Sequence, residues 1–296
     1  ADGKLALGTY VTFADPQVVE IIGLAGYDAA FIDMEHTTFD LALVTEMIRA
    51  ADLVGVTSIV RVPDNDEKLI LRLLDAGAEG IIVPHVDGLE GAKRAVEAVR
   101  YAPLGHRGGA AGTRATRFGS VSWNDHVNQS NEQILLSVMT EDDNGIRDIE
   151  KIAALDGVDL VSIGPTDFSE YMGIRDPQSP ILREKITELA GKIKKIGKAK
   201  MQFPMNHAAM PLGPKELQDL GIKVHTVNYP RNEKSISGRI TSFVRNLSPM
   251  ISYLKGNETF FFAKYNKNGM KNLISRLINK NIFDLIQVEY NVMHHY

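Results

Sequence analysis

The sequence predicts an α/β fold, a (β/α)8 TIM barrel with a C-terminal helical extension. Short runs of β-branched and apolar residues alternate with segments of helical period, as parallel strands do with their crossover helices. Eight such strand–helix units follow one another, which is the number in a barrel, whereas a doubly wound open sheet usually has fewer strands. With 296 residues, the chain is long enough for one barrel of about 250 residues and an extension.

Each expected strand is a short apolar run that a helical segment follows. The eight strands are expected at residues 5–12, 28–35, 57–63, 80–86, 133–141, 158–167, 198–204 and 223–230. The first helix is expected to begin after Asp15, because Asp is a good N-cap and Pro16 suits the first helical position. It should end near Gly26, and the last barrel helix should begin near Asn232.

The end of the chain differs in composition from the rest. Asparagine occurs seven times in the last 40 residues, and apolar residues recur at helical spacing between positions 273 and 286. We therefore expect a catalytic barrel over residues 1–256 and a helical tail over residues 257–296. The tail is interpreted as a docking or oligomerisation segment, and a linker remains the alternative.

Charge and composition exclude several classes of function. The 33 Lys and Arg residues face 37 Asp and Glu residues, for a net charge of −4, so the chain has no general attraction for nucleic acid or acidic membranes. Without cysteine there can be no disulfide, Cys-ligated zinc or thiol nucleophile. No apolar run is long enough for a signal peptide or a membrane helix, which favours a cytoplasmic protein.

One expected connection is too long for a plain strand–helix unit. It runs from Leu104 to Asn131 and contains a segment rich in Gly and Arg, followed by Trp123. Because long loops in compact domains are usually functional or disordered, we interpret this connection as an active-site loop.

The catalytic groups of (β/α)8 enzymes lie at the carboxyl ends of the strands. In this sequence polar residues follow five of the expected strands, and we expect them to converge on one mouth. The candidate site residues are Asp33, Glu35, His36, Arg61, His85, Glu141, Gly164, Pro165, Thr166 and Asp167.

Glu141 and Asp167 are the candidate metal ligands. Carboxylates crowded in a partly dry cleft repel one another, and a hard divalent cation such as Mg²⁺ or Mn²⁺ relieves this repulsion. Two protein carboxylates would leave the other positions of the ion open to water and substrate. For Asp167 the competing interpretation is a simple cap on the helix that follows.

Arg61 and the Gly164–Asp167 turn are candidates for binding anionic oxygens. Arg61 ends an apolar strand and could place two N–H groups on a carboxylate or an enolate oxygen. The alternative is an ion pair with Asp33, Glu35 or Asp64. The turn opens a short helix, whose free N–H groups suit a substrate carboxylate.

Two histidines complete the candidate site. His36 would act as the titratable base, with Asp33 fixing its tautomer and ring orientation. His85 is expected to line the pocket, together with Glu35, on the substrate side.

Six segments of the chain together resemble the HpcH/HpaI aldolase family, the metal-dependent pyruvate aldolases of the phosphoenolpyruvate-utilising barrel superfamily. The resemblance spans about residues 5–250, with the segments in the family's order and approximate spacing. They are LGTYVTFADPQVVEIIGLAGYD, FIDMEHTTFD, IVRVPDND, LLDAGAEGIIVPHV, RYAPLGHRG and VSIGPTDFSEYMG.

The resemblance implies a class II aldolase that cleaves a 4-hydroxy-2-oxo acid reversibly to pyruvate and an aldehyde, through a metal-bound pyruvate enolate. Glu141 and Asp167 would hold Mg²⁺, Mn²⁺ or Co²⁺, Arg61 would stabilise the enolate, and His36 with Asp33 would handle protons. The family also implies a homo-oligomer, typically a hexamer built from dimers that exchange a C-terminal helix.

Two departures from the family pattern leave alternatives open. The chain has Met139 where the family commonly has Gln, and His85 where the family often has Met. Other features are closer to macrophomate-synthase-like members, so oxaloacetate decarboxylation or enolate capture in carbon–carbon bond formation is the first alternative. A barrel without catalysis that serves as a binding or assembly module is the second.

Overall fold

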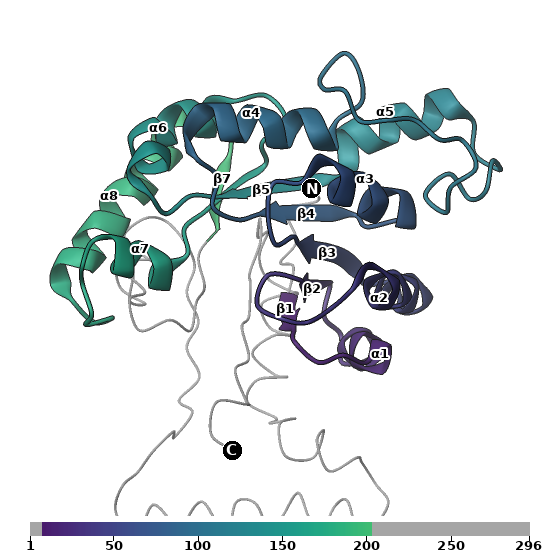
Figure 1. Ribbon diagram of the computed structural model, residues 1–296, viewed down its shortest axis with the longest axis horizontal. Helices are drawn as coiled ribbons and strands as arrows, with labels where there is room; N and C mark the ends of the chain where they lie inside the picture. Colours follow the sequence, from purple (N-terminus) through teal and green to yellow (C-terminus); the bar gives the residue numbers. More distant parts are fainter. Residues whose placement is uncertain (1–7, 203–296) are drawn as a thin grey trace, which may run out of the picture. The chain divides into compact units, whose positions relative to one another are not determined.

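A parallel seven-stranded sheet is the framework of residues 8–202, the part of the chain that this computed structural model describes (Figure 1). Every strand pairs with its neighbours in chain order, from β1 to β7. The strands are β1 (Gly8–Val11), β2 (Ala29–Asp33), β3 (Thr57–Arg61), β4 (Gly80–Val83), β5 (Leu135–Met139), β6 (Leu160–Ser162) and β7 (Lys200–Gln202). The first seven expected strands each contain one of these.

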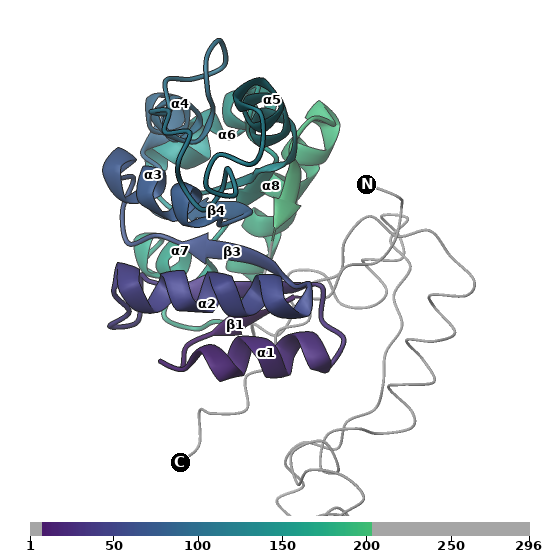
Figure 2. The ribbon, with the colours of Figure 1, turned by 90° about the vertical axis from the view of Figure 1, so that its right-hand side faces the viewer.

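Helices connect the strands and lie along the outer side of the curved sheet (Figure 1). The helices are α1 (Pro16–Leu24), α2 (Leu41–Val54), α3 (Glu67–Ala76), α4 (Gly88–Val99), α5 (Trp123–Gln133), α6 (Asp143–Ala154), α7 (Pro165–Tyr171) and α8 (Pro180–Ile196). Helices α1, α2, α3, α4, α6 and α8 each pack on the next, which Figure 2 shows for α1 and α2.

This arrangement is an α/β fold with a parallel, singly wound half-barrel sheet, as the sequence predicts for the first seven units. The eighth strand expected at 223–230 and the tail expected at 257–296 lie outside the described residues.

Aspartate side chains cap the first three helices, and α1 begins where the sequence predicts. The Asp15 side chain accepts a hydrogen bond from the Gln17 N–H, with Pro16 at the first helical position. Asp40 and Asp66 cap α2 and α3 in the same way.

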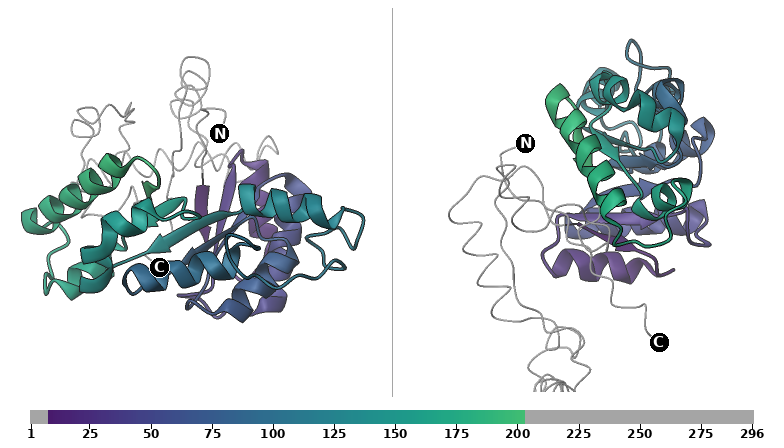
Figure 3. Two further views of the ribbon diagram at one scale, coloured as in Figure 1. Left: turned by 90° about the horizontal axis from the view of Figure 1, so that it is seen from above. Right: turned by 90° about the vertical axis from the view of Figure 1, so that its left-hand side faces the viewer.

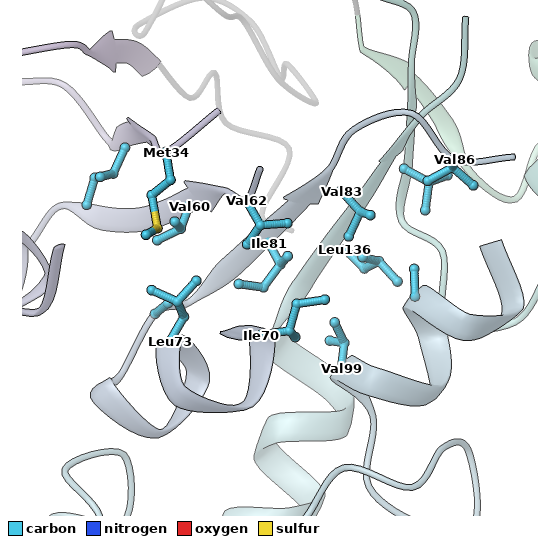
Figure 4. Packing of buried hydrophobic residues seen from close by; sticks show 14 of the residues in the cluster. Met34, Val60, Val62, Ile70, Leu73, Ile81, Val83, Val86, Val99 and Leu136 are labelled. Carbon is cyan, nitrogen blue, oxygen red and sulfur yellow. The ribbon is translucent and has the colours of Figure 1, made fainter. Parts of the chain in front are cut away.

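Successive side chains along each strand point to opposite faces of the sheet, and this divides the buried residues into two clusters. One set of buried side chains faces the helices, as Figure 4 shows for Ile70 and Leu73 of α3, which point at Val60 and Ile81 of the sheet. The smaller set on the other face contains Ala29, Phe31, Ile59, Ile82 and Met139. Two residues beyond Phe31 and Ile59, on the same face, come Asp33 and Arg61, so this face leads directly to the polar strand ends.

The expectation of an active-site loop at residues 104–131 is wrong for this part of the structure. The connection joins the end of α4 to the start of β5, so it must return to the amino ends of the strands, and its second half is the helix α5. Arg107 bonds to Asp75 near the end of α3, and Arg114 bonds to the Ala76 carbonyl. Figures 1 and 3 show α5 and α7 at opposite ends of the sheet.

Within residues 8–202 no helix is both long enough and apolar enough to cross a membrane.

Candidate active site

The predicted site residues gather at the carboxyl ends of β2 to β6. Asp33 and Arg61 are the last residues of β2 and β3 and stand opposite each other in the parallel register. His85 and Glu141 each follow the last residue of their strand by two positions, and Gly164 does the same after β6. The topology therefore brings these groups to one edge of the sheet.

Asp33 holds Arg61 through two parallel hydrogen bonds. Arg61 Nε donates to Asp33 Oδ1 at 2.9 Å, and Arg61 Nη2 donates to Oδ2 at 2.7 Å. The side chain of Asp33 is 2% exposed and that of Arg61 is 13% exposed. The pKa of Arg61 is raised overall: burial lowers it, but the bond to Asp33 and the nearby negative charges outweigh burial. Arg61 is thus a fixed cation at the site.

This pairing differs from the predicted dyad of Asp33 and His36. Within residues 8–202 the Asp33 carboxylate contacts Arg61 and the backbone N–H groups of Glu35 and His36, at 3.0 and 3.4 Å, rather than the His36 ring. The His36 ring is exposed, with its Nε2 3.7 Å from Glu35 Oε2. The ion pair of Arg61 with Asp33 and Glu35, the competing interpretation of the sequence, is what forms, because the register places the two strand ends side by side.

Glu35 links Arg61 to His85. Arg61 Nη1 lies 3.1 Å from Glu35 Oε2, and His85 Nε2 lies 3.0 Å from Glu35 Oε1. The other ring nitrogen of His85, Nδ1, lies 3.3 Å from Glu141 Oε2. A continuous polar chain therefore runs from Asp33 through Arg61, Glu35 and His85 to Glu141.

Glu141 has the fewest hydrogen-bond partners of the residues in this chain of contacts. Its side chain is 5% exposed, and neither carboxylate oxygen receives a hydrogen bond of normal geometry from residues 8–202. Burial, first, and the charge of Asp167, second, raise the pKa of Glu141 to about 7, although the charge of His85 and the Gly164 N–H act in the opposite direction. A buried carboxylate without donors is costly unless a proton or a cation binds it.

Gly164 allows this carboxylate to lie against the start of α7. A Cβ atom at position 164 would come within 1.9 Å of Glu141 Oε1, so a larger residue would displace the carboxylate. Pro165 is the first residue of α7 and is buried, Thr166 follows it, and Asp167 lies in the first turn. The helix has only seven residues.

Tyr10 is a site neighbour that the sequence reasoning missed. The Arg61 guanidinium lies over its ring, 5.0 Å from the centroid, and the ring also contacts Phe31. The available signal was its position near the end of β1, where it pairs with Phe31, two residues before the polar end of β2.

The donor set fits a divalent cation, although it does not form a complete centre by itself. The fit rests on the buried, unpartnered oxygens of Glu141 and on the charge of Asp167 beside them. Within residues 8–202 no three His, Asp or Glu side chains already surround one point as a metal would require.

Comparisons with known proteins agree with the geometry. The profile of the family described as HpcH/HpaI aldolase/citrate lyase matches residues 6–200. Hydroxypyruvate/pyruvate aldolase from Sagittula stellata is 38% identical over 66% of this chain and 77% of that protein. The crystal structure of an HpcH/HpaI aldolase from Desulfitobacterium hafniense superposes with a TM-score of 0.67 at 27% identity, over 83% of this chain and 93% of the other. Macrophomate synthase shares the fold, with a TM-score of 0.64 at 22% identity, over 86% of each chain.

Proposed function

The chain belongs to the HpcH/HpaI aldolase/citrate lyase family, and from this premise we propose that it is a divalent-metal-dependent aldolase that makes and cleaves 4-hydroxy-2-oxo acids. Its relatives at 34 to 38% identity are named aldolases, so the chain is a lyase that acts on a small keto acid and an aldehyde. The finer proposal is that pyruvate or a close analogue such as hydroxypyruvate provides the enolate. The unpartnered, buried carboxylate of Glu141 is the observation that carries the metal dependence.

Glu141 and Asp167 would hold the cation, which could be Mg²⁺, Mn²⁺ or Co²⁺. When bound, the ion supplies Lewis-acid stabilisation of the negative charge that develops on the keto oxygen of the substrate. Burial of Glu141 and its repulsion from Asp167 together raise its pKa to about 7, and a cation at this position would offset both effects.

Arg61 would stabilise the same developing charge from the protein side. Its Nε and one N–H of its Nη2 are occupied by Asp33, so the Nη1 side of the guanidinium remains for Glu35 and a substrate oxygen. Since Asp33 fixes the orientation, little reorganisation is required when the oxygen becomes anionic.

We propose that different groups of the protein bind the substrate carboxylate and exchange the substrate protons. The N–H groups of Thr166 and Asp167, in the first turn of α7, would receive the carboxylate. His36, exposed at the mouth and 3.7 Å from Glu35, would exchange protons with the substrate or with water. Glu35 and His85 would border the substrate on the other side.

The proposal also covers the organisation of the whole chain. We propose that residues 1–256 form the catalytic barrel and that residues 257–296 form a docking or oligomerisation segment in a homo-oligomer.

An aldol assay with the full chain tests the proposal. We expect pyruvate or hydroxypyruvate to condense with short aldehydes when Mn²⁺ is present, and EDTA to abolish the reaction. Arg61→Lys keeps the charge but cannot make the paired bonds to Asp33, so it should lower kcat by about 100-fold or more. The matched control is Arg94→Lys on the exposed side of α4, which should leave kcat unchanged. Undiminished turnover in EDTA would contradict the proposal.

A further inference from the structure

His85 contacts both Glu35 and Glu141, and its backbone has an unusual conformation. Its φ angle is +48°, in the left-handed region that residues with a side chain seldom adopt. The side chain lies between Glu35 and Glu141, with one ring nitrogen near each carboxylate. Strained backbone of this kind is concentrated at functional sites.

The two contacts of the ring differ in kind. His85 Nε2 is 3.0 Å from Glu35 Oε1, which is a normal distance for an N–H donor to a carboxylate. A hydrogen on Nε2 leaves a lone pair on Nδ1. Nδ1 faces Glu141 Oε2 at 3.3 Å, and this oxygen receives no hydrogen bond from the described residues. Nδ1 of His85, whose side chain is 58% exposed, and Oε2 of the buried Glu141 thus face each other.

A neutral ring nitrogen and a carboxylate oxygen that face each other can bind one divalent cation together. Ligand bonds of about 2.1 Å place neighbouring ligands of one octahedral ion about 3 Å apart, close to the observed 3.3 Å. The contact of Nε2 with Glu35 gives the second feature of metal-bound histidines, because such rings usually donate their other N–H to a carboxylate or carbonyl.

We propose that His85 Nδ1 is a nitrogen ligand of the same divalent cation that Glu141 holds. The inference rests on the proposed function, since it adds a ligand to that metal site. His85 and Glu141 supply two donors that already lie side by side, and Asp167, water and substrate supply the rest. A mixed nitrogen and oxygen set favours Mn²⁺ or Co²⁺ over Mg²⁺, which prefers oxygen alone.

The experiment is pulsed electron paramagnetic resonance on the full chain loaded with Mn²⁺ alone, with a Mn²⁺ titration for affinity. We expect the modulation of a directly bound imidazole nitrogen in the wild type and its loss in His85→Asn, which tolerates the left-handed conformation. Mn²⁺ affinity should fall by about tenfold or more in this variant. Mg²⁺ affinity should fall less.

His106→Asn is the matched control. His106 is as exposed as His85, 57% against 58%, and also lies between two glutamates, Glu67 and Glu97, but on the outer surface of α3 and α4. It should leave the modulation and the affinity unchanged.

The outcomes separate this inference from the proposed function. Mn²⁺ that binds without nitrogen modulation, or with modulation that persists in His85→Asn, overturns the role of His85. If Glu141→Gln then abolishes Mn²⁺ binding, the proposal that Glu141 holds the metal still stands. Binding of Mn²⁺ that Glu141→Gln does not weaken overturns the metal site and with it both proposals.

Discussion

Glu141 shows how a single buried residue can be unfavourable for folding and useful for binding. Burial and the charge of Asp167 raise its pKa from 4.5 to about 7. Between these values the native protein keeps the proton that the unfolded chain releases, so the free energy of unfolding falls as pH rises. Above about pH 7 the full penalty is present, of the order of 3 kcal/mol for a shift of this size. Binding a cation would offset it.

Glu141→Gln therefore has a pH-dependent effect on stability. In EDTA the variant should be more stable than the wild type by about 2–3 kcal/mol at pH 8 and about equal to it at pH 5, because the amide carries no charge to bury. Chemical denaturation at both pH values measures the difference. An equal difference at the two pH values would show that the carboxyl does not titrate in this range.

Gly164 matters because a side chain at this position would meet the Glu141 carboxylate. Its φ is −76°, which alanine adopts freely, so Gly164→Ala should fold with a loss of about 1 kcal/mol or less. The new Cβ would collide with Glu141 Oε1, and the displaced carboxylate should weaken Mn²⁺ binding about tenfold or more. Gly112→Ala is the control, because its Cβ would meet nothing within 4 Å. Equal Mn²⁺ affinities in the two variants would remove the proposed role of Gly164.

At the scale of elements, the connection between α4 and β5 contributes to stability and lies away from the proposed metal site. Arg107 is fully buried, bonds to Asp75 at 3.0 Å and lies over the Tyr101 ring. These contacts fix the connection to the end of α3, away from the carboxyl ends of the strands. The connection is thus part of the framework within this chain.

Arg107→Ala should lower the free energy of unfolding by about 3 kcal/mol, since it leaves Asp75 without its buried partner. Mn²⁺ affinity should stay within about twofold of the wild type, because Arg107 contacts no element of the proposed metal site. The exposed Arg94→Ala on α4 should change stability by less than about 0.5 kcal/mol. A large loss of Mn²⁺ affinity in Arg107→Ala would restore the expectation of an active-site loop.

The elements that the sequence predicts well are those whose signals are local. Asp15 with Pro16 marks the start of α1, and the short apolar runs mark all seven observed strands. The helix α5 was missed because its sequence is mostly polar, although Ser122 with Asp125 three residues later is an N-cap signal. The direction of the long connection depends on topology, which composition does not reveal.

The partners within the site were less predictable than its location. The strand-end rule found Asp33, Arg61, Glu141 and the turn at Gly164 from sequence alone. Which acid pairs with Arg61 depends on register, and Asp33 stands directly opposite it. The bridge that His85 makes between Glu35 and Glu141 depends on a backbone angle of +48°, for which the sequence holds no signal.

At the scale of the whole molecule, the curved parallel sheet of residues 8–202 has the candidate site residues at the carboxyl ends of its strands and the long connection before β5 at the other end. The family relationship rests on residues 6–200, nearly the same span that supplies the seven strands and every candidate site residue. We propose that this span activates a 2-oxo acid as its enolate with the help of a divalent cation.

The most direct test is exchange of the pyruvate methyl protons in D₂O, which needs no knowledge of the aldehyde. The full chain with Mn²⁺ or Mg²⁺ should catalyse the exchange, and EDTA, Glu141→Gln or Arg61→Ala should each reduce it by about 100-fold or more. Exchange at the full rate in EDTA or in Glu141→Gln would contradict the account.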